Sequence, residues 1–191
     1  MPIPKRNLNT GVEGELGKKG LVNLAEYIPN LKLKIVYATP NNIVNKQIYR
    51  EPLCYLRKEA AEALRRVADE LKKQGLALVI FDAYRPMSLQ KYLFDAIPDK
   101  RYVRETSDHN QGIAVDVTLA DANGVLPMPT NLDVFSEKSH HGYMKLPKNA
   151  IENREKLKRI MEKHGFEAFE FEWWHYTYAK LKNAEFLDIL I

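Results

Sequence analysis

Two short segments, far apart in the chain, together carry the residue types of a metal site. Residues 107–116 read Ser-Asp-His-Asn-Gln-Gly-Ile-Ala-Val-Asp, and residues 172–175 read Glu-Trp-Trp-His. They offer two imidazoles and a carboxylate as ligands, with a second carboxylate shortly before the later histidine. A catalytic zinc needs three protein ligands and an open fourth position, and a nearby carboxylate can take a proton from its bound water. The sequence therefore predicts a zinc hydrolase whose fold brings the two segments together.

The composition is that of an ordinary globular protein. The chain has 191 residues, of which 45% are hydrophobic and 28% charged, and this favours one domain over residues 1–191. No apolar run approaches the ~18 residues of a membrane span, and no apolar signal segment is visible at the N-terminus. Cys54 is the only cysteine, which excludes an internal disulfide and a cysteine-based zinc site. We expect a cytoplasmic protein, or a periplasmic one if a signal peptide was removed, and the oligomeric state stays open.

The charge balance is mildly basic, with 29 Lys and Arg against 25 Asp and Glu. Such an excess could favour an anionic partner, such as nucleic acid or a cell-wall polymer. However, the basic residues of 57–73 and 154–163 are interleaved with acidic ones, and no aromatic-basic stacking pattern accompanies them. Solvated helix faces explain them better, so no nucleic-acid partner is expected.

Apolar residues at spacings of three and four predict two main helices. The first covers residues 53–71, and Gly75 stands where a C-cap is expected. The second runs from a cap at residue 149 to about residue 164 and is closed by Gly165. A shorter helix is predicted over residues 88–97, with a serine as its cap.

Four strands are predicted, at residues 31–38, 76–81, 113–119 and 169–178. An irregular arm is expected at residues 1–30. In the third strand, branched apolar residues alternate with small or polar ones, so the face that carries Asp116 is otherwise nearly free of side chains. A carboxylate there needs a partner, and a metal is one good candidate. The elements predict a single-domain α+β fold, a mixed or antiparallel sheet packed by the two main helices.

The two segments leave alternatives open when each is taken alone. His109 and Asp116 could form a structural hydrogen-bonded pair, although Gly112 clears space beside them. In a strict strand, residues three apart face opposite sides, so Glu172 and His175 reach one metal only if the chain bulges or turns between them. Otherwise Glu172 would be an exposed strand residue and His175 a core histidine.

The segments resemble the VanX-type D-alanyl-D-alanine dipeptidases, zinc D,D-peptidases that share a core with the hedgehog signalling domain. Two further stretches contribute to the resemblance, Asp-Ala-Tyr-Arg-Pro at residues 82–86 and Met-Pro-Thr-Asn-Leu-Asp-Val-Phe at residues 128–135. The match extends from about Tyr37 to Tyr178 in the order of the family. The resemblance implies the zinc D,D-peptidase, or hedgehog-like, fold.

The resemblance also implies a set of catalytic residues. One zinc ion per chain would be held by His109, Asp116 and His175. Glu172 would act as general base and then as general acid. Arg85 would stabilise the oxyanion that forms when the metal-bound water attacks the peptide carbonyl.

Three more residues are implied in substrate binding or support. Ser107 would help to hold the substrate, Asp133 would meet its free ammonium group, and Asp82 would orient Arg85. On the residues alone, Arg85 could equally be a turn arginine in a surface salt bridge, and Asp133 could be a helix cap.

The leading interpretation is a zinc dipeptidase that cleaves D-alanyl-D-alanine or a related small dipeptide. One alternative is a D,D-carboxypeptidase or endopeptidase that acts on peptidoglycan stem peptides. Asp133 and the doubled tryptophan after Glu172 favour the dipeptidase over it. A second alternative is a non-catalytic, zinc-containing interaction domain. The presence of Glu172 and Arg85 argues against this domain, because a structural zinc needs neither.

Overall fold

The protein is built on one mixed sheet, seen in a computed structural model that describes residues 10–29, 31–97, 99 and 101–191. The strand order is β2 (Lys32–Leu33), β4 (Ala77–Asp82), β5 (Ala114–Asp121), β8 (His175–Tyr178) and β7 (Phe166–Ala168), and β6 (Gly124–Val125) pairs with β5. The β2 and β4 strands are parallel, and all other neighbours in this sheet are antiparallel. The predicted α+β class with a mixed sheet is confirmed.

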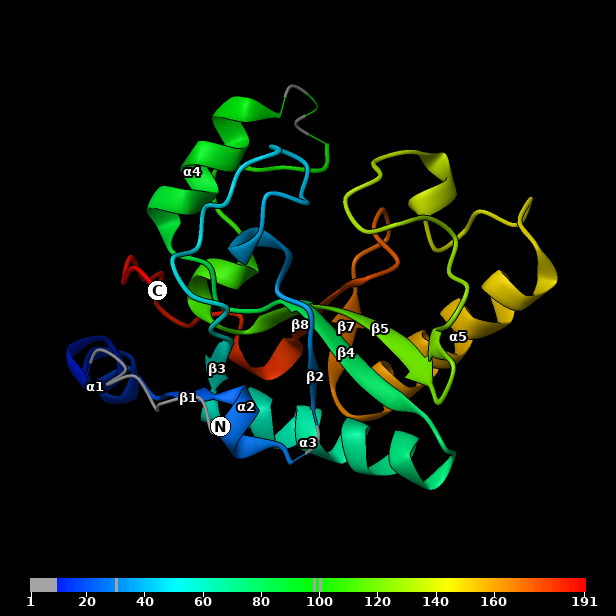
Figure 1. The fold of residues 1–191 in the computed structure, drawn as a ribbon, viewed down its shortest axis with the longest axis horizontal. Coiled ribbons are helices and arrows are strands. Elements are labelled where there is room, and N and C mark those ends of the chain that lie inside the picture. Colours follow the sequence, from blue (N-terminus) through cyan, green and yellow to red (C-terminus); the bar gives the residue numbers. More distant parts are fainter. Residues whose placement is uncertain (1–9, 30, 98, 100) are drawn as a thin grey trace, which may run out of the picture.

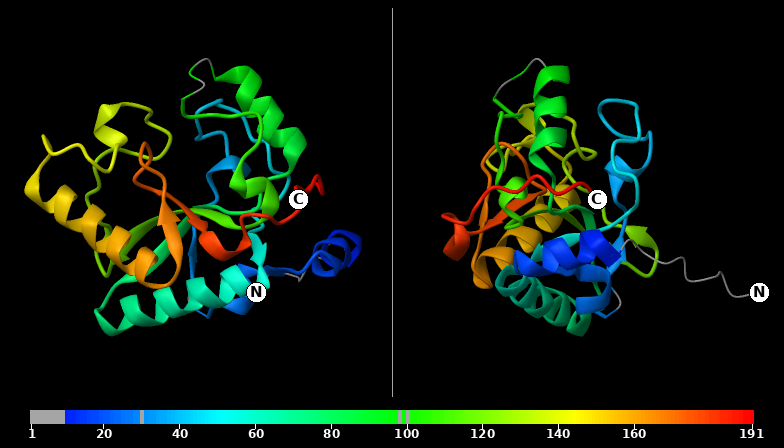
Figure 2. Two further views of the ribbon diagram at one scale, coloured as in Figure 1. Left: turned by 180° about the vertical axis from the view of Figure 1, so that it is seen from behind. Right: turned by 90° about the vertical axis from the view of Figure 1, so that its left-hand side faces the viewer.

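The two main helices cover one face of this sheet. Helix α3 (Lys58–Lys73) packs on β4, and α5 (Lys148–Lys163) packs on β7 and β5. Helix α4 (Met87–Ala96) and the long loops stand on the other side of the sheet (Figures 1 and 2). Within the described part of the chain, none of the helices has the length and apolarity needed to cross a bilayer. The face of the sheet opposite α3 and α5 is thus left to α4 and to the loops that build the site (Figure 1).

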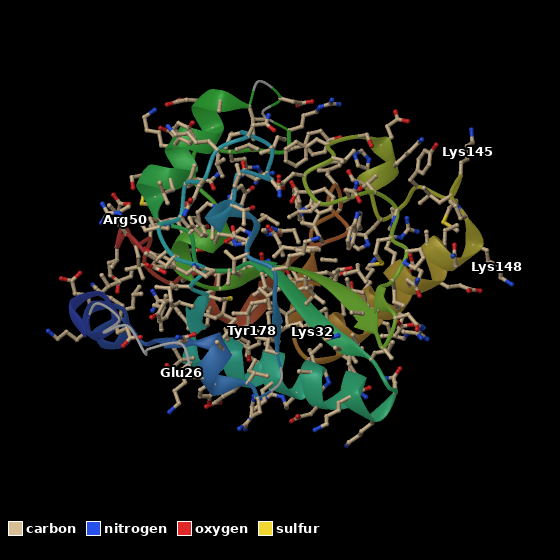
Figure 3. The ribbon with its side chains drawn as sticks, viewed as in Figure 1. Glu26, Lys32, Arg50, Lys145, Lys148 and Tyr178 are labelled. Atoms are coloured by element: carbon tan, nitrogen blue, oxygen red, sulfur yellow. The ribbon has the colours of Figure 1, made fainter. Side chains whose placement is uncertain are left out.

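The core lies between the sheet and these helices. Val115, Val117 and Leu119 of β5 are completely buried, and they alternate along the strand with Asp116. This alternation gives one apolar face to the core and one polar face to the loops. Charged side chains such as Glu26 and Lys148 project from the periphery (Figure 3). The same strand thus supports both the core and the site.

The expectation of an irregular arm over residues 1–30 was wrong for the part that is described; residues 1–9 lie outside the described residues. The described part forms α1 (Thr10–Lys18), β1 (Leu21–Asn23) and α2 (Leu24–Tyr27), and it packs beside β3 (Tyr55–Arg57). The β1 and β3 strands pair antiparallel in a separate two-stranded sheet. Leu16 and Leu24 are fully buried. Burial of such residues stabilises elements that their glycine-rich sequence would not favour alone.

Three predicted elements have other limits in the structure. The helix predicted from residue 53 begins at Lys58, because Leu56 belongs to β3 and pairs with β1. The strand predicted over residues 31–38 is short and continues into a 3₁₀ turn. Of the strand predicted over residues 169–178, only β8 forms, and residues 169–174 make the turn that joins it to β7. The described residues include the 3₁₀ helices η1 (Val36–Ala38), η2 (Asp108–Gln111), η3 (Glu137–Ser139) and η4 (Ala179–Leu181).

Gly112 joins η2 to β5 and has a backbone that favours glycine. Its φ is 67°, and a Cβ placed there would lie 3.0 Å from Leu21 Cδ2 and 3.7 Å from Arg57 Cγ. Gly75, which follows α3, has a similar φ of 73° but no atom within 4 Å of the same position. A comparison of alanine substitutions at the two glycines therefore separates the cost of the left-handed backbone from the cost of side-chain crowding.

We predict that Gly112→Ala lowers the free energy of unfolding more than Gly75→Ala does. Both variants carry the left-handed backbone penalty of ~1–2 kcal/mol. Gly112→Ala must in addition displace buried Leu21, and such overpacking costs ~1–3 kcal/mol. Urea unfolding of the two variants measures the difference. Equal losses would contradict the packing role given to Gly112.

Candidate metal centre and active site

His109 is held by a capped turn at the entrance to β5. It lies in η2, and the Ser107 hydroxyl oxygen accepts a hydrogen bond from the His109 backbone N–H at 3.3 Å. In return, Asn110 Oδ1 accepts from the Ser107 backbone N–H at 2.8 Å. This reciprocal capping fixes the short turn that carries the histidine. Ser107 thus supports the site, and its side chain also lines the pocket.

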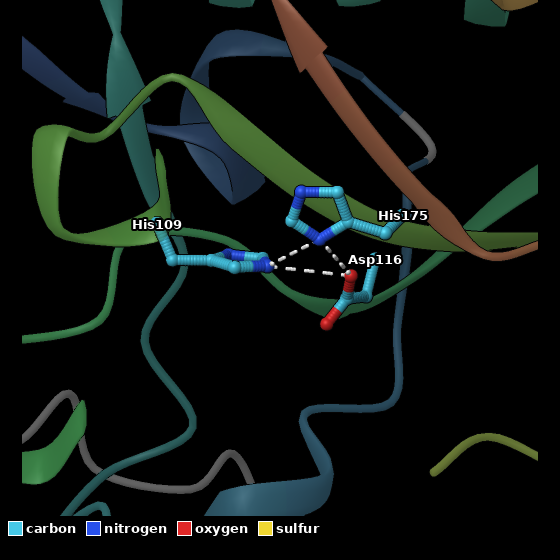
Figure 4. Close-up of side chains that lie close together, drawn as sticks. All are labelled: His109, Asp116 and His175. Atoms are coloured by element: carbon cyan, nitrogen blue, oxygen red, sulfur yellow. Dashed lines mark hydrogen bonds and ion pairs between the residues drawn. The ribbon is translucent and has the colours of Figure 1, made fainter. Parts of the chain in front are cut away.

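The other two predicted ligands meet across the sheet. Asp116 on β5 is the register partner of His175, the first residue of β8. The three ligand atoms form a nearly equilateral triangle (Figure 4). His109 Nε2 lies 3.2 Å from His175 Nδ1 and 3.3 Å from Asp116 Oδ1, and the last two atoms are 3.2 Å apart. The structure therefore brings His109, Asp116 and His175 together in one cluster.

Neighbouring groups orient both imidazoles. His109 Nδ1 lies 2.5 Å from the Ala83 carbonyl oxygen, an acceptor, so this nitrogen carries the proton. His175 Nε2 lies 3.4 Å from the Thr177 hydroxyl, which itself donates to Asp108 Oδ2 at 2.6 Å. Because the Thr177 hydroxyl donates its hydrogen to Asp108, its oxygen can accept a hydrogen bond from the Nε2–H of His175. In their neutral forms both histidines consequently turn the unprotonated nitrogen toward Asp116, as metal-ligating histidines with such outer partners do.

This arrangement fits a tetrahedral metal ion. Bonds of ~2.0–2.2 Å to nitrogen and oxygen place tetrahedral ligands about 3.3–3.5 Å apart, close to the separations that the three atoms show. Three lone pairs that face one another repel unless a cation or a proton lies between them. Two histidines and a carboxylate leave a fourth position for a substrate or water. His109, Asp116 and His175 could therefore hold the ion.

The segment before His175 is a turn rather than a strand. The Glu172 backbone N–H donates to the Phe169 carbonyl oxygen, and the His175 N–H donates to that of Glu172. This turn lets residues three apart face the same pocket, which strict strand alternation would forbid. Glu172 is 7% exposed, and its Oε2 lies 3.9 Å from His175 Nδ1. The interpretation of Glu172 as an exposed strand residue was therefore wrong.

The two carboxyl groups beside the histidines have opposite pKa shifts. Burial alone would raise the pKa of Asp116, but without a metal the protonated forms of His109 and His175, which carry charge and donate hydrogen bonds to it, hold this pKa well below its usual range. Burial raises the pKa of Glu172 to about 8, against the opposing charge of His175. A bound cation would lower the pKa of Glu172 again. Asp116 is thus suited to binding a cation, and Glu172 to exchanging a proton.

Arg85 lies directly after β4 and is buried at the edge of the pocket. Its Nε and Nη2 both donate to Asp82 Oδ2, at 3.0 and 2.6 Å, and its Nη1 donates to Gln90 Oε1 at 2.6 Å. Asp82 is fully buried and also accepts from the Tyr49 hydroxyl. The guanidinium lies 5.0 Å from the centre of the Tyr37 ring. Arg85 is therefore in a buried ion pair, not in the surface salt bridge considered as an alternative.

Asp133 lies on the loop after β6 and faces the same pocket. Its φ of 58° is in the left-handed region, and its Oδ2 accepts a hydrogen bond from the Tyr37 hydroxyl at 3.0 Å. Desolvation, together with the charge of Asp116, raises the pKa of Asp133 to about 7, although Arg85 opposes the shift. No described helix begins at Asp133, so the helix-cap alternative was wrong. The carboxyl group is suited to a cationic partner.

These residues line a pocket of about 130 Å³, which lies on the face of the sheet opposite α3 and α5, beside α4 and the loops. Ser107, Arg85 and Asp133 line it with the three metal-ligand candidates, whereas Asp82 lies behind Arg85. Two other lining residues, Gln90 and Arg104, were not predicted from the sequence. Gln90 could have been noticed as a polar residue on the buried face of a predicted helix. Arg104 lies in a loop, where no sequence periodicity indicates which side chains face a pocket.

Comparisons with known proteins agree with this geometry. The family model Peptidase M15, described as D-Ala-D-Ala dipeptidase, matches residues 17–188. A D-alanyl-D-alanine dipeptidase of Escherichia coli K12 is 40% identical over 160 residues, which cover 82% of this chain and 83% of that protein. The D-alanyl-D-alanine dipeptidase of Enterococcus faecium is 31% identical over 183 residues, covering 83% of this chain and 91% of that protein. The chain therefore belongs to the D-Ala-D-Ala dipeptidase family of M15 peptidases.

Proposed function

We propose that the chain hydrolyses D-alanyl-D-alanine, or a closely related dipeptide, with one zinc ion held by His109, Asp116 and His175. The observation that carries the proposal is the triangle of ligand atoms, 3.2–3.3 Å apart, with Glu172 beside it. Family membership supports a metal-dependent peptidase. The donor set supports zinc, because two imidazoles and one carboxylate with an open position are typical of catalytic zinc sites.

Glu172 is assigned the proton transfers. When bound, zinc supplies a Lewis acid that makes water a good nucleophile at neutral pH and polarises the peptide carbonyl. The Glu172 carboxylate takes a proton from the attacking water and delivers it to the amine that leaves. Its burial supports this role, because a carboxyl group whose pKa lies near neutrality can both accept and release a proton.

Arg85 and Asp133 are assigned to charges on the substrate. Arg85 lies with Nη2 3.8 Å from Asp116 Oδ2, so its positive charge faces the reacting centre. There it stabilises the negative charge that develops on the carbonyl oxygen, while Asp82 holds its orientation. Asp133 binds the free ammonium group of the dipeptide, which relieves its uncompensated desolvation.

The geometry favours a dipeptidase over the two alternatives. Asp133 at the pocket suits a substrate with a free ammonium group near the cleaved bond, which a stem peptide lacks there. A non-catalytic zinc domain would not need a buried Glu172 or a buried Arg85 at the pocket. A shared hydrophobic core across the described residues supports one catalytic domain.

Glu172→Gln should retain the metal and lose most of the turnover. The amide has nearly the same shape but cannot accept the proton, and general acid–base catalysis contributes ~10²–10⁴-fold. The measurement compares kcat and metal content with those of the wild type. Glu170→Gln is the matched control, because Glu170 is exposed in the same turn. Near-normal turnover of Glu172→Gln would assign the proton transfer to another group.

Blocking the amine of the dipeptide should depress kcat/KM at least about a hundredfold, equivalent to ~2.7 kcal/mol. The reason is that Asp133 would keep a desolvated carboxylate without its cation. Asp133→Asn should remove much of this discrimination between the free and the N-acetylated dipeptide, with Glu137→Gln on the same loop as a control. If the wild type cleaves N-blocked and longer peptides equally well, the carboxypeptidase alternative is the better account.

A further inference from the structure

The pocket contains charged residues of both signs, including Asp108 and Arg104, which have no role in the proposed function. Its described lining includes four carboxylates and two arginines: Asp108, Asp116, Asp133, Glu172, Arg85 and Arg104. A dipeptide with free ends carries an ammonium group and a carboxylate. The proposed function gives the ammonium to Asp133 but gives the carboxylate no partner. A carboxylate that leaves water needs a hydrogen-bonded cation to offset its desolvation.

Arg85 is already engaged by other groups. Asp82 and Gln90 accept three of its N–H bonds, and the carboxylate of Asp82 balances its charge at 2.6 Å. Its Nη2 also lies 3.8 Å from Asp116 Oδ2, where the reaction would take place. If the carboxylate of the substrate also bound this guanidinium, it would compete with the oxyanion for the same donors. The substrate carboxylate therefore requires a different cation.

Arg104 differs from Arg85 in its exposure and in its charged neighbours. Its side chain is exposed, and among the residues that the structure describes no carboxylate lies within 4.0 Å of its guanidinium. The guanidinium lies 5.8 Å from the centre of the Phe169 ring. Phe169 in turn packs edge-on against the His175 ring, at 5.7 Å between centres. Arg104 thus brings an uncompensated positive charge to the His175 side of the pocket.

The backbone of Arg104 is fixed by a buried side chain. The Gln90 amide N–H donates to the Arg104 carbonyl oxygen at 2.6 Å, while Gln90 Oε1 accepts from Arg85 at 2.6 Å. Gln90 is 2% exposed. One amide on α4 therefore connects both arginines of the pocket. This connection, with the cation–π contact to Phe169, restricts where the Arg104 guanidinium can lie, which lowers the entropic cost of binding an anion.

We propose that Arg104 binds the C-terminal carboxylate of the dipeptide and so determines specificity for a free C-terminus. The inference rests on the proposed dipeptidase function. Asp133 lies beside Tyr37, near Arg85 and Asp116, whereas Arg104 lies beside Phe169 and His175. The two charged ends of the substrate would then flank the metal centre. A guanidinium suits this task because its planar donors match a carboxylate in a bidentate pair.

The test compares D-alanyl-D-alanine with its C-terminal amide, on the zinc-loaded wild type and on Arg104→Met. Methionine keeps an unbranched stem that can pack on Phe169 but has no charge. The wild type should prefer the free carboxylate on the order of 10-fold to 100-fold in kcat/KM, the range expected for a charged hydrogen bond. Arg104→Met should lose this preference, mainly through a higher KM for the free dipeptide. Its kcat/KM for the amide should stay unchanged.

Arg101→Met is the matched control on the same loop, because Arg101 is exposed and paired with Asp99. It should keep the preference of the wild type. An Arg104→Met enzyme that still prefers the free carboxylate overturns the inference, as does a wild type without any preference. A wild-type enzyme that cleaves the dipeptide in either of these cases leaves the proposed function standing. A zinc-loaded wild type that cleaves neither compound overturns both.

Discussion

The antiparallel register of β5 and β8 is the constraint on which the rest of the site depends. It sets Asp116 opposite His175, so that one ligand pair is fixed by backbone hydrogen bonds of the central sheet. The third ligand, His109, lies in the capped turn that leads into β5, and Gly112 provides the backbone conformation at that junction. A shift of register by one residue would turn Asp116 into the apolar core. The metal centre and the core are thus specified by the same strand pairing.

The electrostatics of the pocket follow from what this arrangement buries. Asp82 and Arg85 neutralise each other, and Asp116 is stabilised by the two histidines. Glu172 and Asp133 are compensated only in part, and desolvation raises their pKa values to about 8 and about 7. Removing carboxylates from water without a partner costs stability. A cation at the metal centre and an ammonium group at Asp133 would each relieve this cost, which explains why a protein can retain such a pocket.

Much of the site could be predicted from the sequence, because the motif residues lie next to recognisable elements. The small, polar face of β5 identified Asp116, and the helices α3 and α5 followed from their periodicity. The relation of Glu172 to His175 could not be predicted, since it depends on a turn that interrupts an apparently continuous strand of aromatic residues. Arg104 could not be predicted either. Its position follows from tertiary contacts with Gln90 and Phe169, and local sequence carries no sign of these.

The most direct test of the account is the metal content of the purified protein with and without its ligand candidates. Elemental analysis of the wild type should find one zinc ion per chain, and removal of the ion by a chelator should abolish dipeptide hydrolysis until zinc is restored. His109→Ala and His175→Ala should lose both zinc and activity. His164→Ala should lose neither, because His164 pairs with Glu70 away from the pocket. Full activity in a metal-free protein, or normal zinc content in the His109 and His175 variants, would contradict the account.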